Sequence, residues 1–215
     1  LVNMGEIPNY GKISFNSTVM KADFKITVGT IIPHVHNGFG GGPKNIMPGI
    51  CDFETIKKHH LKNVLHLNSR VGIVEDNPFL IDLVRIARLA RINFTVQCLN
   101  DSFGNVYEIL SGDMMEVFDV GIKKQKAALG YEVPEQTDVT IVSSFPYDEG
   151  VQIMKSFMPS AMVTKPGGHL FVVTELAQPF PEFFINGIRQ IKGDANCVIK
   201  PATLERLLRC EPLID

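Results

Sequence analysis

The sequence predicts an α/β protein with two α/β lobes, the second a Rossmann-like, mostly parallel sheet with flanking helices. Short apolar runs rich in β-branched residues alternate with segments of helical periodicity along much of the 215-residue chain. A polar, proline-containing link at 133–137 separates two such patterns. Beyond it, strands and helices alternate, which is typical of parallel strands joined by right-handed crossovers. We therefore expect one domain over 1–134 and a second, truncated domain over 135–215.

The elements of the first lobe follow from caps, periodicity and turn residues. Asp52 and Asn77 are typical N-cap residues, and Pro78 suits the first helical position. The Asn-, Asp- and Gly-rich stretch 100–105 separates two strand-like runs and predicts a β-hairpin. The predicted elements are a strand at 13–16, a helical turn at 19–23, a buried strand at 24–32, a helix from 52, a helix at 79–91, hairpin strands at 92–99 and 106–110, and a helix at 114–129 that stops at Gly130.

The second lobe repeats a strand–helix unit. Ligands of such layers bind at the carboxyl ends of the strands, and 145–148 lie at such an end. The predicted elements are a strand at 138–144, a helix at 148–163, a turn at 165–168, a strand at 169–174, a helix at 181–192, a short strand at 197–200 and a helix at 203–209.

Composition excludes several classes of protein. The net charge of −2 gives no general attraction to nucleic acid or to an anionic membrane. No apolar run reaches the roughly 20 residues that span a bilayer. The four cysteines form no CxxC pair, which favours reduced thiols and a cytoplasmic location. The chain opens on Leu1 without a signal-type segment, so we expect it to be an internal piece of a longer protein.

The residues that carry chemistry gather between Pro33 and His60. The predicted strand delivers His34 to a glycine-rich loop that contains Lys44 and breaks at Pro48-Gly49. Glycines allow close approach of the backbone, and successive N–H groups can bind an anion. A lysine suits phosphate or covalent attachment, and histidines supply acid–base groups or metal ligands. The combination predicts a cofactor site. It is not a P-loop, because the GxxxxGK[ST] spacing is missing.

The loop resembles the signature of the lactate racemase family, whose members use a nickel-pincer nucleotide. The family pattern is Glu-Pro-His, two variable residues, Ala-Gly-aromatic-Ser-Gly-Gly, one variable residue and Lys, followed by Pro-Gly and a helix that ends in Asn-His. His34 and Lys44 match the motif histidine and lysine at the same separation, and His60 matches the later histidine. The choice of His60 over the adjacent His59 rests on this spacing.

The resemblance implies a role for each matched residue. His34 is one of two general acid–base groups, Lys44 holds the cofactor covalently, and His60 is a nickel ligand. Gly38, Gly41 and Gly42 form the loop that approaches the cofactor. In the second lobe, a Gln-x-x-Lys pair precedes a Lys-Pro-Gly-Gly turn, as in the family, and implies that Gln152 and Lys155 contact a carboxylate substrate.

The implied activity is racemisation or epimerisation of a 2-hydroxy acid, by proton abstraction and reversible hydride transfer to the nickel-pincer nucleotide. The implied partners are a small hydroxy acid and cofactor-maturation proteins. We expect the opposite acid–base residue to lie outside this chain, so that the isolated piece is incomplete even where the parent protein is an isomerase.

The match has departures, and other functions stay open. Ile32, Gly40 and His36-Asn37 stand where the family has glutamate, serine and an aromatic–alanine pair. The departures bear on substrate preference, and one alternative is a family member that has lost its activity. A second is a non-enzymatic phosphate- or nucleotide-binding domain. A third is a zinc hydrolase that uses the four histidines of this stretch, His34, His36, His59 and His60, although no HExxH motif is present.

Overall fold

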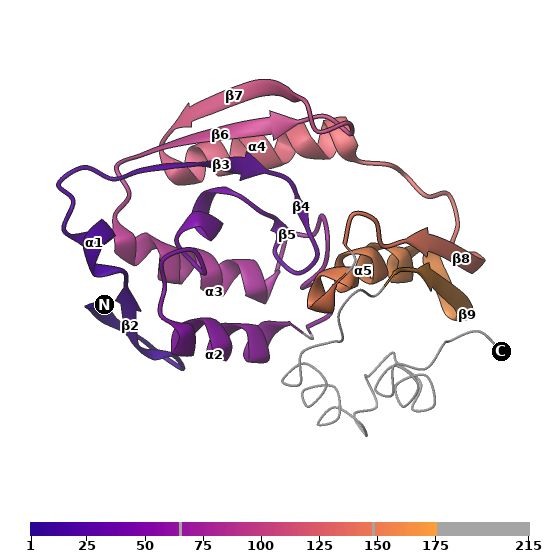
Figure 1. Ribbon diagram of the computed structural model, residues 1–215, viewed down its shortest axis with the longest axis horizontal. Helices are drawn as coiled ribbons and strands as arrows, with labels where there is room; N and C mark the ends of the chain where they lie inside the picture. The colour runs from indigo at the N-terminus through magenta and orange to yellow at the C-terminus, as the bar shows by residue number, and fades with distance from the viewer. Residues whose placement is uncertain (65, 148, 176–215) are drawn as a thin grey trace. The chain divides into compact units, whose positions relative to one another are not determined.

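The computed structural model describes residues 1–64, 66–147 and 149–175. The chain divides into two compact units, Leu1–Pro134 and Glu135–Asp215, and each is described by itself. Parallel and antiparallel strands occur together with helices, so the predicted α/β class is confirmed (Figure 1).

The unit Leu1–Pro134 carries the elements β1 Val2–Ile7, β2 Gly11–Phe15, α1 Ser17–Met20, β3 Ile26–Ile31, β4 Pro33–His34, β5 Gly38–Phe39, η1 Gly42–Asn45, α2 Phe53–Asn63, α3 Pro78–Ala87, η2 Arg88–Ala90, β6 Phe94–Asn100, β7 Val106–Gly112 and α4 Met114–Leu129.

A three-stranded sheet in the order β3-β6-β7 forms one layer of this unit. β3 pairs with β6 in parallel, and β6 with β7 as the predicted antiparallel hairpin. Helix α4 packs along one face, where Phe118 joins Ile31 and Leu99 in a buried cluster (Figure 1). The expectation that the run 24–32 is a buried strand is wrong for one of its two faces. Ile26 and Val28 are 57% and 70% exposed, because alternate residues of β3 point away from α4.

Side-chain caps explain where three helices begin, and the caps at Asp52 and Asn77 are the predicted ones. Asp52 Oδ1 accepts a hydrogen bond from Thr55 N at 2.9 Å at the start of α2. Asn77 caps α3, and Asp113 caps α4. Helix α4 ends at Leu129 before Gly130, as expected. The helix predicted at 79–91 is α-helical only as far as Ala87 and continues as the 3-10 helix η2. The helical turn predicted at 19–23 lies earlier in the chain, at α1.

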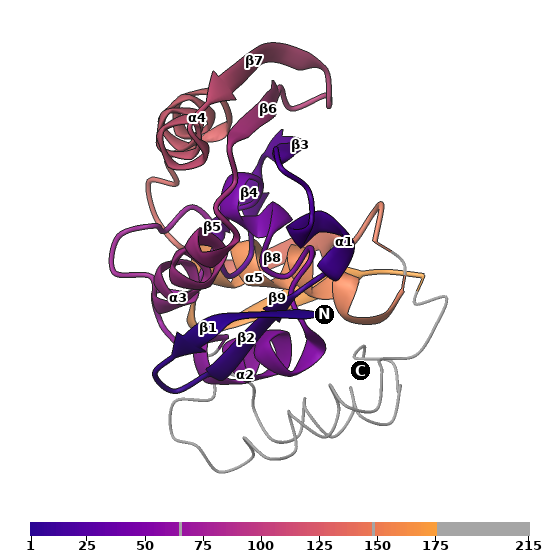
Figure 2. The same cartoon turned by 90° about the vertical axis from the view of Figure 1, so that its left-hand side faces the viewer.

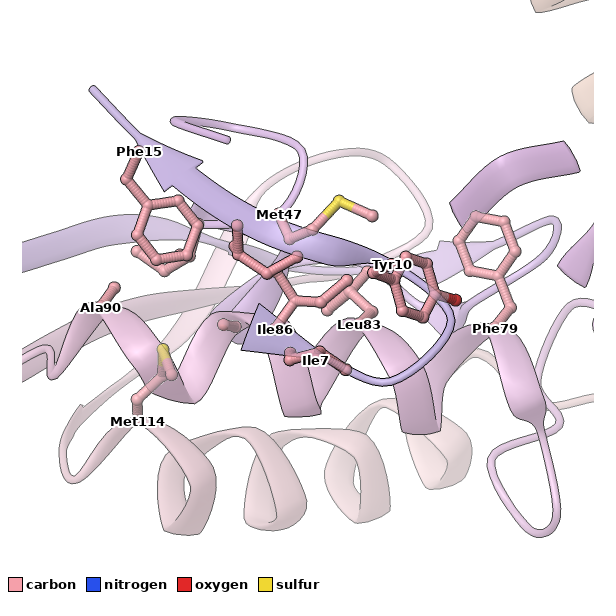
Figure 3. Packing of buried hydrophobic residues seen from close by; sticks show 12 residues of the cluster. Ile7, Tyr10, Phe15, Met47, Phe79, Leu83, Ile86, Ala90 and Met114 are labelled. Carbon is pink, nitrogen blue, oxygen red and sulfur yellow. The ribbon is translucent and has the colours of Figure 1, made fainter. Parts of the chain in front are cut away.

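The largest core packs around α3. Its apolar side chains meet residues of the β1–β2 hairpin and Met47 of the glycine-rich loop (Figure 3). The hairpin lies beside α2, where Lys58 Nζ donates to the Tyr10 carbonyl at 2.9 Å (Figure 2). The fully buried members labelled in Figure 3 include Tyr10, Phe15, Met47, Phe79, Leu83, Ile86 and Ala90. The glycine-rich loop is therefore part of the folded core and is not a loose surface turn.

The second unit begins with a strand, a helix and a parallel strand. Its elements are β8 Thr137–Ser143, η3 Gly150–Ile153, α5 Met154–Val163 and β9 Thr164–Val173, with β8 and β9 paired in parallel. The predicted turn at 165–168 instead belongs to β9, at an irregularity in the register with β8. The predicted helix 148–163 starts later, as a 3-10 turn. The elements expected at 181–192, 197–200 and 203–209 lie outside the described residues, and the Rossmann-like arrangement stays a prediction.

Candidate functional site

A tight hairpin places His34 directly after the central sheet. β4 pairs with β5, with His34 opposite Gly38, and Gly40 N donates to the Ile32 carbonyl at 2.7 Å. Within the turn, His34 Nδ1 accepts hydrogen bonds from the backbone N–H groups of His36 (3.2 Å) and Asn37 (3.1 Å). The ring is half-buried. The hairpin thus fixes both the position of His34 and the environment of its Nδ1 atom.

The glycines of the loop are required by contacts within the protein itself. Gly38, Gly41 and Gly42 have φ angles of 74°, 84° and 49°. A Cβ atom would lie 2.3 Å from Ile73 O at Gly38, 2.5 Å from Thr30 O at Gly41, and 2.8 Å from the Phe118 ring at Gly42. These positions need glycine for backbone conformation and close packing. From the sequence, we predicted that these glycines allow the backbone to approach a cofactor closely. Contacts within the protein are enough to explain why glycine is needed at these three positions.

Several N–H groups of the loop already have acceptors inside the chain. Gly42 N donates to Gln97 Oε1 at 3.1 Å, and Lys44 N donates to the Gly41 carbonyl at 3.0 Å. With Gly40 N bound to Ile32, three amides of the predicted anion nest are used for folding. This counts against the alternative of a phosphate-binding loop.

Gln97 is a site residue that sequence reasoning missed. It is fully buried on β6, its Oε1 holds the loop through Gly42, and its Nε2 donates to Thr95 Oγ1 at 2.7 Å. The signal was a pair of polar residues two apart in an apolar strand, since Thr95 and Gln97 share the face that meets the loop.

Lys44 lies near the rings of His36 and His60. Burial is the main cause that lowers the pKa of His36 to about 4, and the charges of His60 and Lys44 act in the same direction. A hydrogen bond to the Ser69 backbone acts in the opposite direction and raises this pKa. Burial also lowers the pKa of His60, with the Lys44 charge acting in the same direction. The stem of Lys44 runs beside Gly40, where a Cβ atom would lie 3.9 Å from its Cδ. Both imidazoles are therefore neutral near pH 7 in the presence of this ammonium group.

The two adjacent histidines of α2 have different roles. His59 is fully buried, and its Nε2–H donates to the Phe79 carbonyl at 2.8 Å. Burial lowers the pKa of His59 to about 4. His60 is half-buried, and its Nδ1–H donates to the Ile56 carbonyl one turn earlier at 2.8 Å. The proton of the neutral His60 ring is thus on Nδ1, which leaves the Nε2 lone pair as the donor for a metal.

Phe79, the first-turn residue of α3, brings the histidines together. Its ring centroid lies 6.5 Å from His34, 5.7 Å from His36, 4.3 Å from His59 and 5.0 Å from His60. The ring is fully buried at the end of the core that Figure 3 shows. The sequence prediction treated this residue only as part of a helix. Nothing in the helix pattern showed that histidines from β4, the following turn and α2 surround it.

A three-ligand zinc centre has no support in residues 1–64, 66–147 and 149–175. Over these ranges, no three His, Cys, Asp or Glu side chains come together as a metal site. His59 is fully buried in the core, so it does not fit the role of a ligand.

Gln152 and Lys155 belong to the second compact unit. Gln152 lies exposed in η3, and Lys155 lies in the first turn of α5. Lys155 Nζ lies 4.5 Å from the centroid of the Tyr147 ring. The neighbouring Tyr147 follows the end of β8, where ligands of parallel layers bind.

Comparison with known proteins connects this site with a family. The profile of the lactate racemase N-terminal domain matches residues 1–72, which contain His34, Lys44 and His60. The lactate racemase of Thermoanaerobacterium thermosaccharolyticum is 27% identical over 177 residues, which are 81% of this chain. That of Lactiplantibacillus plantarum is also 27% identical over 177 residues, or 80% of this chain. The resemblance to the lactate racemase family is confirmed.

The fold agrees with that of lactate racemases. The apoprotein structure of lactate racemase from Thermoanaerobacterium thermosaccharolyticum superposes with a TM-score of 0.76 at 23% identity, over 96% of this chain and 53% of that one. A Thermotoga maritima protein superposes with a TM-score of 0.56 at 16% identity, over 96% of this chain and 59% of that one. The matched region is 42% of the length of each curated lactate racemase. Within the part of the chain that the structure describes, every helix is too short or too polar to cross a bilayer.

Proposed function

We propose that this chain contributes the cofactor-holding residues of a racemase or epimerase that acts on a 2-hydroxy acid. The observation that carries the proposal is the arrangement around Phe79. There His34 and His60 come together, and Lys44 is close enough to His60 to lower its pKa. The same residues match the lactate racemase motif by spacing, and both curated relatives are lactate racemases.

His60 is proposed as a nickel ligand through Nε2. A metal-ligating histidine commonly donates its other ring N–H to a carbonyl or carboxylate, which fixes the ring and its tautomer. His60 has this partner in the Ile56 carbonyl. A histidine must be neutral to bind a metal. Because burial and the Lys44 charge lower the pKa of His60, its ring is neutral near pH 7.

Lys44 is proposed as the point of covalent attachment of a nickel-pincer nucleotide. Its amine follows the rigid glycine turn, whose backbone is held by Gln97 and by the packing of Gly41 and Gly42. Covalent attachment uses the lysine amine as the nucleophile. When bound, the nucleotide would supply a reversible hydride acceptor beside the substrate carbon.

The substrate is proposed to lie between His34 and a second acid–base group. His34 exchanges the hydroxyl proton on one face, and the group for the opposite face comes from outside this chain. Gln152 and Lys155 are proposed to hold the carboxylate through an amide and an ammonium group. Removal of the hydrogen on carbon 2 as hydride would leave a planar 2-keto acid. Return of the same hydride to the other face would invert the configuration at carbon 2.

The test uses the full-length protein, produced together with cofactor-maturation proteins, and lactate that carries deuterium at carbon 2. The proposal expects the optical activity to disappear while deuterium stays on carbon 2, because the same hydride leaves and returns. Loss of deuterium to water would contradict the hydride mechanism. A nickel-loaded protein that racemises neither lactate nor longer 2-hydroxy acids would contradict the function. Lys44→Arg provides a variant with the charge kept and the attachment point removed.

A further inference from the structure

The turn after His34 determines which ring nitrogen of His34 carries the proton. Nδ1 faces two backbone N–H groups, those of His36 and Asn37, at 3.2 and 3.1 Å. A nitrogen that accepts from N–H donors cannot hold a proton itself. The neutral ring is therefore the Nε2–H tautomer, which is opposite to the Nδ1–H tautomer of His60.

Asn77 holds this turn against the start of α3. Its Nδ2 donates to the His36 carbonyl at 2.9 Å and to the Ile73 carbonyl at 2.8 Å. Its Oδ1 accepts from Phe79 N at 3.0 Å and from Leu80 N at 3.2 Å, which is the N-cap of the helix. The side chain is fully buried. One amide group therefore joins the turn of His34 to the helix that carries Phe79.

The other side of the hairpin is clamped as well. Gly72 N donates to the Gly38 carbonyl at 3.0 Å, and a Cβ at Gly38 would strike Ile73 O. The His36 ring stacks on Phe79 with 29° between the planes. The residues that bear the two amides thus have little freedom to turn away from His34 Nδ1.

We propose that Asn77 is a positioning residue which, through the His34–Asn37 turn, holds His34 in the Nε2–H tautomer. This inference rests on the proposed role of His34. In this state Nε2 donates a hydrogen bond to a substrate oxygen and has no lone pair to take a proton. To act as a base, the ring must pass its Nε2 proton to water and bind one from water at Nδ1, with no net change of charge. That exchange requires Nδ1 to leave the two amides, so the turn controls when His34 serves as a base.

The tautomer is measured directly by ring ¹⁵N chemical shifts of this chain with ¹⁵N-labelled histidine, His34 being assigned by its loss in His34→Gln. We expect Nδ1 of His34 at the shift of an unprotonated nitrogen and Nε2 at that of a protonated one, with the reverse at His60. A protonated Nδ1 at His34 would overturn the inference.

The variant Asn77→Ser keeps a capping oxygen and removes the two amide donors. We expect the two His34 shifts to move toward each other as both tautomers become populated. Asp113→Ala, which removes the cap of α4, is the matched control and leaves the His34 shifts in place. Unchanged His34 shifts in a folded Asn77→Ser chain would also overturn the inference. These readouts need no cofactor or substrate, so a full-length protein without racemase activity would refute the proposed function and leave the tautomer result standing.

Discussion

At Gly41 a single methyl group would strike the chain itself. The residue has a φ angle of 84°, and its Cβ would lie 2.5 Å from the Thr30 carbonyl oxygen and 3.0 Å from Gln97 Oε1. Its neighbour Gly40 is different, since a Cβ there would meet nothing closer than 3.7 Å. The departure of Gly40 from the family serine is therefore compatible with the packing, whereas the glycine at 41 is not exchangeable.

Substitution of these two glycines tests that distinction. Gly41→Ala is expected to lower the free energy of unfolding by at least about 2 kcal/mol, because it combines a left-handed backbone with a backbone clash. Gly40→Ser is expected to change it by less than about 1 kcal/mol. Urea unfolding of both variants measures the difference, and equal losses would show that the loop is not packed as described.

The buried histidines give the first unit a sensitivity to acid. The pKa values of His36 and His59 fall from 6.5 to about 4 on folding, mainly through burial. The unfolded chain then binds more protons than the folded chain between these values, so stability falls as the pH drops through this window. Each residue is expected to cost about 2 kcal/mol between pH 7 and pH 5.

The variant His59→Gln isolates one of these contributions. Its side-chain amide can still donate to the Phe79 carbonyl, but it does not titrate. We expect the loss of stability between pH 7 and pH 5 to be smaller than in the wild type by about 2 kcal/mol, the contribution of His59. His66→Gln, at an exposed histidine, is the matched control for replacing a histidine by glutamine. Urea midpoints at the two pH values decide the matter, and a pH slope unaffected by His59→Gln would contradict the burial argument.

At the scale of elements, α2 depends on one carboxylate. Asp52 caps the helix through Thr55 N and also accepts from Ser14 N at 3.0 Å, which ties β2 to the helix that presents His60. Burial alone would raise the pKa of Asp52, but its hydrogen bonds with Thr55 and Ser14 lower it. The same residue thus starts the helix and places it against the hairpin.

Removing this cap has a defined cost. Asp52→Ala is expected to destabilise the chain by about 1–2 kcal/mol, since two backbone N–H groups lose their acceptor. Asp52→Asn keeps a capping oxygen and is expected to lose less. Glu54→Ala, in the same first turn and exposed, is the control, with an expected loss of a few tenths of a kcal/mol. Thermal unfolding compares the three, and an Asp52→Ala loss no larger than that of Glu54→Ala would refute the role.

Local signals predicted the elements well where the physics is local. Asp52 and Asn77 cap helices as predicted, and the turn at 100–105 forms the expected hairpin. Long-range contacts were not predictable in this way. The sequence does not show that Phe79 meets four histidine rings, or that Gln97 is the acceptor for Gly42. The glycine spacing predicted a loop, but its cause is contact with Thr30, Ile73 and Phe118.

At the scale of the whole molecule, the chain carries one part of the proposed site. The sequence motif placed His34, Lys44 and His60 in one stretch, and Phe79 lies beside the rings of both histidines. The chain spans 42% of the length of its curated relatives, and the second acid–base group is proposed to lie beyond it. Function is therefore best tested on the full-length protein.

The intact mass and nickel content of the full-length protein, produced together with cofactor-maturation proteins, test directly whether Lys44 and His60 hold the cofactor. We expect a mass increase localised to Lys44 by peptide mapping and about one nickel per chain, the ratio set by a single pincer cofactor. His60→Ala should keep the adduct and lose most of the nickel, whereas His66→Ala should keep both. An unmodified Lys44 and no nickel, under conditions that mature a control lactate racemase, would overturn the proposed roles of Lys44 and His60.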